Sequence, residues 1–176
     1  MKIKLLPLIF FSILLCFSCK NETLSTLEQE ITALDSAEKK KAYLEAIFAD
    51  DQGVRGEDKN GQNMGEADAS NMEKIEKYLD IHGYPKRSEV GETASSAPWI
   101  VIHHQPSYNN DEIRHKYFPI LYQAYWDENI KGSQMWLFLD RMYYNKHDKR
   151  FKMKSPYMEA DAIDSMIQVL EIRKQN

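Results

Sequence analysis

Apolar residues recur every three or four positions along most of the chain, and this period limits the fold more than any other feature. It matches the turn of an α-helix, so each such stretch has one apolar side to bury. Strict alternation of apolar and polar residues, which is typical of strands, is confined to residues 150–154. We therefore predict a mainly all-α fold with at most one short extended segment, at residues 150–154.

Helices are expected at six places in the mature chain. Their predicted starts are Ala37, Asp68 or Ser70, Thr93, Asn109 or Asn110, Ser133 and Met158. The run Trp99 to Ile102 fits a helix or a strand by period alone, and the poor strand formers at 94–97 favour a helix. Pro98 is then expected in the first turn of that helix, whereas Pro119 is expected to kink the next helix or to mark a second start.

The chain of 176 residues is long enough for one compact domain and too short for two ordinary ones, and we place this domain at residues 37–176. Residues 19–36 are polar with scattered apolar positions, which predicts a tether or a weak amphipathic helix. Residues 53–70 hold four glycines among acidic and amide residues. Such a composition loses more chain entropy on folding than it recovers by burial, so we predict a surface loop there.

The N-terminus has the features of a bacterial export signal. Lys2 and Lys4 precede an apolar run from Leu5 to Phe17 that is too short to span a bilayer. The run ends in Ser18-Cys19, which resembles a lipobox, although Cys16 stands where an apolar residue such as Leu is usual. We predict that residues 1–18 are a lipoprotein signal peptide and that Cys19 is lipidated. An ordinary cleaved signal and an uncleaved anchor are the alternatives.

Lipidation at Cys19 fixes both the location and the available chemistry. Several acyl chains, palmitate among them, hold a protein stably on a membrane surface, which here is expected to be the periplasmic or surface face of the outer membrane. Because the chain has two cysteines, one removed with the signal and one lipidated, no free thiol remains. Cysteine nucleophiles, disulfides and thiolate metal sites are therefore excluded together.

Charge and motifs exclude several further classes of function. The chain has 23 Lys and Arg against 27 Asp and Glu, and this net charge of −4 argues against nucleic acid as a partner. It has no glycine-rich nucleotide motif and no serine in a nucleophile elbow, so no cofactor is predicted. His103 and His104 are adjacent, and side chains that diverge by roughly 100° on a helix do not readily share a metal ion.

Four short motifs resemble those of a bacterial family of unknown function. They are Asp51-Gln52-x-x-Arg55, Gly83-Tyr84-Pro85, an apolar run ending in His103-His104, and Asp140-Arg141, in this order. The family pattern has Gln where this chain has His103, and its segment after the Asp-Arg pair is replaced here by residues 150–157. The resemblance covers residues 43–141 and implies a mostly helical domain without an assigned reaction.

The resemblance also implies that the polar residues of these motifs meet between helices in one hydrogen-bonded network. The catalytic candidates are Asp51, His104 and Asp140, and the ligand-binding candidates are Gln52, Arg55 and Arg141. Paired acids and guanidinium groups can be wholly structural. The same groups can also form a pocket in which arginines bind an anion and a histidine or aspartate acts as an acid or base.

Two classes of function follow from this network. The first is a membrane-anchored binding or interaction module, whose partner is an unidentified protein or a small polar ligand. The second is a small enzyme, such as a hydrolase, that acts on a polar or anionic substrate through the same residues. We favour the first, because the anchor, the acidic surface and the aromatic content are sufficient for it.

The anchor is directly testable. We expect cells that express the full-length chain to label it with an alkyne fatty acid, and the Cys19→Ala variant to lose this label. A Cys16→Ala variant is the matched control and should keep the label. Labelling of Cys19→Ala at the wild-type level would contradict lipidation at this position.

Overall fold

The computed structural model describes residues 25–56, 64–106, 111–152 and 159–172, and these ranges contain helices and no strand. The predicted all-α fold is therefore confirmed. The helices are α1 (Thr26–Thr32), α2 (Ala37–Gly53), α3 (Met64–His82), α4 (Arg87–Val90), α5 (Glu92–His104), α6 (Glu112–Trp126), α7 (Gly132–His147) and α8 (Glu159–Leu170).

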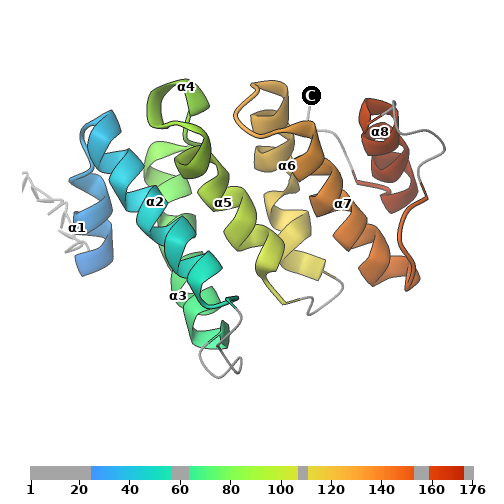
Figure 1. Cartoon of the computed structure of the whole chain (residues 1–176), viewed down its shortest axis with the longest axis horizontal. Coiled ribbons are helices and arrows are strands. Elements are labelled where there is room, and N and C mark those ends of the chain that lie inside the picture. Colours follow the sequence, from blue (N-terminus) through green and yellow to red (C-terminus); the bar gives the residue numbers. More distant parts are fainter. Residues whose placement is uncertain (1–24, 57–63, 107–110, 153–158, 173–176) are drawn as a thin grey trace, which may run out of the picture.

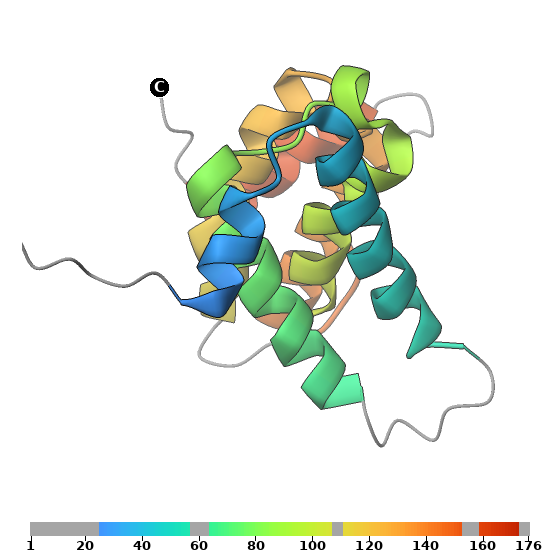
Figure 2. The same cartoon turned by 90° about the vertical axis from the view of Figure 1, so that its left-hand side faces the viewer.

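The helices follow one another in chain order along the longest axis of the molecule (Figure 1). The C-terminal ends of α2, α5 and α7 lie at the same edge, which is the lower edge in Figure 1, together with the N-terminal ends of α3 and α6. Figure 2 views the array from the α1 end and shows α5 between α2 and α3, both of which pack against it. The ends of α2, α3, α5, α6 and α7 thus lie at one edge of the molecule.

Helix α5 is the centre of the fold, because it packs on α2, α3, α4, α6 and α7. Residues 94–102 are all buried. The helix begins at Glu92, so Pro98 lies in its middle and the prediction of a first-turn proline is wrong. Pro98 has no N–H and its ring disturbs the preceding turn. The Tyr84 hydroxyl donates to the carbonyl of Ser95 in that turn at 2.9 Å, so a side chain from outside the helix also bonds to its backbone there.

The predicted loop at residues 53–70 is wrong over much of its length. Gly53 is the last residue of α2, and α3 already begins at Met64, so neither Asp68 nor Ser70 caps it. Residues 57–63 lie outside the described ranges. Tertiary contacts stabilise this first part of α3, in which Asp68 and Asn71 are buried. Asp68 accepts from Arg55, just beyond the end of α2, and Asn71 donates to Asp50 of α2.

Other boundaries also differ from the sequence prediction. The weakly apolar stretch at residues 19–36 contains the helix α1, whose Ile31 is fully buried in the core. Helix α7 begins at Gly132 and is capped by Gln134, whose Oε1 accepts from the backbone N–H of Lys131 at 2.8 Å, so Ser133 is not its cap. Of the extended segment predicted at residues 150–154, residues 153 and 154 lie outside the described ranges, and 150–152 form no strand.

The apolar sides of the helices form one continuous core. Helix α8 shows the pattern clearly, since Ile163, Met166, Ile167 and Leu170 recur at helical spacing and are all buried. Within the described ranges, every helix is too short or too polar to cross a bilayer.

Gly91 joins α4 to α5 with φ 85° and ψ 173°, a conformation that is open almost only to glycine. We expect Gly91→Ala to lower the free energy of unfolding by about 1–3 kcal/mol, measured by chemical denaturation. Gly65→Ala is the control, because Gly65 lies in the first turn of α3 with open space around it and should gain or lose little. Equal effects of the two substitutions would contradict strain at Gly91.

Candidate functional site

The helices α2, α5 and α7 end at one edge of the molecule (Figure 1). Polar side chains that are distant in the sequence bond to one another near these ends. A helix leaves its last carbonyl groups without partners inside the helix, and a buried helix end must find them elsewhere. This edge therefore needs hydrogen-bond donors and offers positions for charged groups.

Asp51 is the centre of the first group of these side chains. It lies in the last turn of α2 and is fully buried. Its Oδ2 accepts from Gln52 Nε2 at 2.8 Å and lies 2.9 Å from His104 Nδ1, while its Oδ1 accepts from Arg55 Nη1 at 3.1 Å. Four of the six predicted residues thus meet at this carboxylate.

Asp68 belongs to the same group, although the sequence analysis did not select it. Its Oδ1 accepts from Arg55 Nη2 at 2.5 Å, so the guanidinium group bridges the two aspartates of α2 and α3. Gln105 Nε2 also donates to the backbone carbonyl of Asp68 at 3.1 Å. We call Asp51, Gln52, Arg55, Asp68 and His104 the rim cluster.

In the rim cluster, the central aspartate is buried, whereas its basic partners are partly exposed to solvent. The side chain of Asp51 is 1% exposed, whereas those of Arg55 and His104 are 19% and 17% exposed. Gln52 is exposed. A buried carboxylate held by a guanidinium and an imidazole is a stable arrangement, and its basic partners still reach solvent.

A second set of arginines caps the C-terminal end of α5. Arg114 is fully buried, and its Nη2 donates to the carbonyl of His103 at 2.7 Å and to that of Gln105. Its Nη1 donates to Asp111 Oδ1. Arg141 Nη1 donates to the same His103 carbonyl at 3.2 Å. Charged donors at a helix C-terminus also interact favourably with the helix dipole.

Asp140 does not join the rim cluster, so the predicted network of six residues is corrected at this position. Its Oδ2 accepts from Arg150 Nη1 at 2.6 Å and its Oδ1 from the backbone N–H of Phe151 at 2.9 Å. The partners come from the segment that follows α7, and such a long-range partner is not encoded in the spacing of the Asp-Arg pair. Asp140 fixes the exit of the chain from α7.

Arg141 differs from the other arginines at this edge. Arg55, Arg114 and Arg150 each pair with an aspartate, whereas Arg141 forms no ion pair with any described residue. Partial burial lowers the pKa of Arg141, and the positive charges of Arg114, Arg150 and Arg55 add to this effect, which Asp111 opposes. The surroundings of this guanidinium are therefore short of negative charge.

His103 is held in its neutral form. Burial lowers the pKa of His103 to about 3, and the positive charge of Arg141 contributes next. Its ring stacks on Trp99 with the centroids 5.3 Å apart and lies 5.5 Å from the ring of His104. Within the described ranges, no three His, Cys, Asp or Glu side chains are placed to hold a metal ion.

The sequence analysis missed three residues of this edge: Asp68, Asp111 and Arg114. Asp68 fell in the predicted loop. Asp111 and Arg114 are three apart, a spacing at which an acid and a base pair along a helix, and this was the available signal. Their burial could not be read from the sequence, because it depends on where α5 ends.

Comparison with known proteins adds no family to this description. No family model, curated protein or solved structure matches the chain. The resemblance to a family of unknown function therefore stays a prediction from the motifs, and the function has to be inferred from the residues.

The low pKa of His103 leads to a pH prediction. Unfolded His103 takes up a proton below its ordinary pKa of 6.5, whereas the folded protein resists this until about pH 3. Because the unfolded state then binds more protons, the free energy of unfolding should fall as the pH drops from 6.5 toward 3. We expect His103→Gln to flatten this fall, measured by denaturant titrations at several pH values.

His115→Gln is the control for this experiment, because His115 is an exposed histidine of α6. It should keep the wild-type dependence of stability on pH. The same slope in His103→Gln and in the wild type would show that His103 is protonated in the folded protein.

Proposed function

We propose that this chain is a membrane-anchored bacterial lipoprotein whose helical domain binds a small anionic ligand at the edge where α2, α5 and α7 end. The anchor rests on the sequence of residues 1–18 and on Cys19, which lie outside the described ranges. It would hold the domain at the cell envelope, on a membrane surface that faces the periplasm or the exterior. The domain itself supplies the binding site.

The observation that carries the proposal is the uncompensated charge of Arg141. Partly buried guanidinium groups are normally paired, because removing a charge from water is costly without a partner. Arg141 donates one bond, to the His103 carbonyl, and leaves other N–H groups of its planar fork without a described acceptor. A carboxylate or phosphate accepts two such bonds in parallel.

The neighbours of Arg141 favour the same class of ligand. Arg114, Arg150 and Arg55 each pair with an aspartate, but they still lower the pKa of Arg141, so an anion at this point would relieve the repulsion among the guanidinium groups. His104 is one residue beyond the shared carbonyl, and its Nε2 bonds to no described residue. His104 is thus a second basic side chain of this edge with a ring nitrogen that no described residue binds.

A small enzyme is the second candidate, and the bond between His104 and Asp51 favours it. The buried carboxylate accepts from Nδ1, which leaves the lone pair on Nε2 at the partly exposed side of the ring. This is the arrangement of a general base held by an acid. Its signature would be consumption of an anionic substrate that His104→Gln abolishes while binding persists.

Ligand binding is tested by thermal unfolding of the full-length chain in lipid nanodiscs, followed by tryptophan fluorescence. Inorganic phosphate and acetate are added at constant ionic strength, with chloride as the reference salt. We expect one of them to raise the melting temperature by about 5–10 °C at a hundred times its Kd. This rise in melting temperature should disappear in Arg141→Gln, which removes the positive charge and the planar guanidinium group.

Arg87→Gln is the matched control, because Arg87 forms an exposed pair with Glu92 and belongs to α4, which lies at the opposite edge of the molecule (Figure 1). It should keep the full response to the anion. An anion response that is equal in the wild type and in Arg141→Gln, or absent from both, would overturn the proposal.

A further inference from the structure

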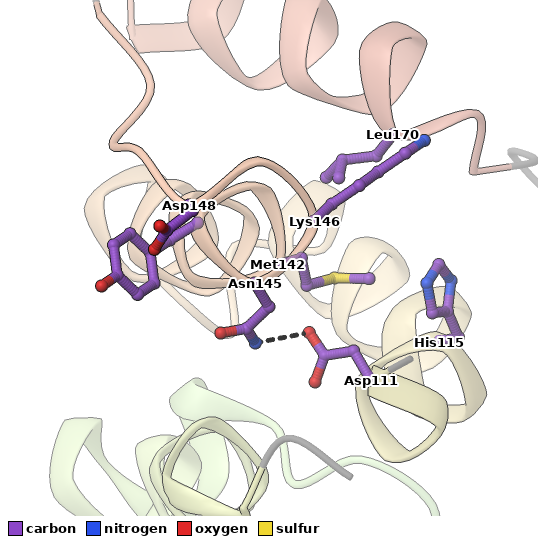
Figure 3. Close-up of a pocket in the computed structure, with 8 residues that line it drawn as sticks. Asp111, His115, Met142, Asn145, Lys146, Asp148 and Leu170 are labelled. Atoms are coloured by element: carbon purple, nitrogen blue, oxygen red, sulfur yellow. Dashed lines mark hydrogen bonds between the residues drawn. The ribbon is translucent and has the colours of Figure 1, made fainter. Parts of the chain in front are cut away.

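A cavity lies away from the rim cluster, between α6, α7 and α8 (Figure 3). It measures about 780 Å³, which is within the range of sites for small molecules. None of the six residues selected from the sequence lines it. A ligand bound here would therefore be distinct from an anion at Arg141.

Part of the wall of this cavity is apolar. Met142 of α7 and Leu170 of α8 line it, and both belong to the buried core. A methionine side chain is flexible and polarisable, so it adapts to apolar groups of different shape. Tyr144, which is 43% exposed, adds an aromatic ring to the lining, so this part of the cavity can contact a hydrocarbon chain.

Two basic side chains, Lys146 and His115, lie on one side of the cavity. Figure 3 shows Lys146 extended beside Leu170, with His115 of α6 on the same side of the view. The Lys146 ammonium lies 3.3 Å from the carbonyl of Val169 and 3.7 Å from a carboxylate oxygen of Glu171, which is 85% exposed. Such solvent-exposed ion pairs are weak, so a ligand anion can replace Glu171.

The two acidic residues that line the cavity do not oppose an anion at Lys146. Asp111 already accepts from Arg114 through Oδ1 and from Asn145 through Oδ2, at 3.0 Å in the latter bond. Asp148 lies on the side of the view opposite Lys146 and His115 (Figure 3). The negative charge of Asp111 is therefore neutralised by its partners, and that of Asp148 lies across the cavity from Lys146 and His115.

We infer that this cavity binds an acidic amphiphile, with its hydrocarbon chain against Met142 and Leu170 and its head group beside Lys146 and His115. The inference does not depend on the anion site at Arg141. A free fatty acid and an anionic phospholipid share this chemistry, and the experiment separates them.

The test is photo-crosslinking of the full-length chain in phosphatidylcholine nanodiscs, followed by peptide mapping. One arm uses a fatty acid with a diazirine in its chain, and the other uses phosphatidylglycerol with the same chain. We expect at least one acidic probe to label the peptides that carry Met142 and Leu170 more strongly than the matching diazirine alcohol does. Labelling by one arm alone identifies the source of the ligand and supports the inference.

Lys146→Met and Lys149→Met form a matched pair of variants, because both lysines are exposed and only Lys146 lines the cavity. We expect Lys146→Met to reduce labelling by the acidic probe about fivefold, as expected when a charged contact is lost. Lys149→Met should leave it unchanged. Equal labelling in both variants, or labelling by the alcohol as strong as by both acidic probes, would overturn the inference.

Discussion

The buried C-terminal end of α5 is the constraint on which the polar edge of this molecule depends. The helix passes through the centre of the fold, so its last carbonyl groups end among side chains instead of in water. Leaving them without donors would cost a desolvation penalty for each group. Arg114 satisfies two of them, and Asp111 compensates its charge. A fully buried arginine is tolerated here because the carbonyl groups at the helix end and the Asp111 carboxylate accept hydrogen bonds from its guanidinium group.

The same requirement explains why charged residues are concentrated at this edge. Four arginines and four aspartates interact around the ends of α2, α5 and α7, and all of them except Arg141 form ion pairs. The pair of Arg55 and Asp68 connects the end of α2 to α3, whereas the other pairs join residues that are closer in the sequence. Structural pairing and ligand binding therefore coexist. The pairs hold the edge in one geometry, and Arg141, which has no aspartate of its own, is the group whose charge remains available.

The helices could be predicted from the sequence because their signal is local. The period of apolar residues identifies α2, α5, α7 and α8 without reference to any neighbour. The predictions that were wrong concern residues whose positions depend on partners elsewhere in the chain. Asp68 was expected in a loop but lies in α3, where Arg55 binds it, and Asp140 leaves the predicted network because Arg150 and Phe151 bind it. Asp51, Arg55 and His104 were predicted to meet, and they do. This prediction came from the resemblance of the motifs, because the spacing of His104 from Asp51 does not by itself indicate a contact.

Asp111 connects the two regions to which we assign ligands. One of its oxygens accepts from Arg114, which caps α5 near Arg141, and the other accepts from Asn145, which lines the cavity between α6, α7 and α8. Removing the Asp111 carboxylate would leave Arg114 buried without its aspartate and would also change the cavity wall. A loss of ligand binding in such a variant could therefore not be attributed to either site. Lys146 and Arg141 avoid this difficulty, because each contributes to one site and neither supports a buried charge.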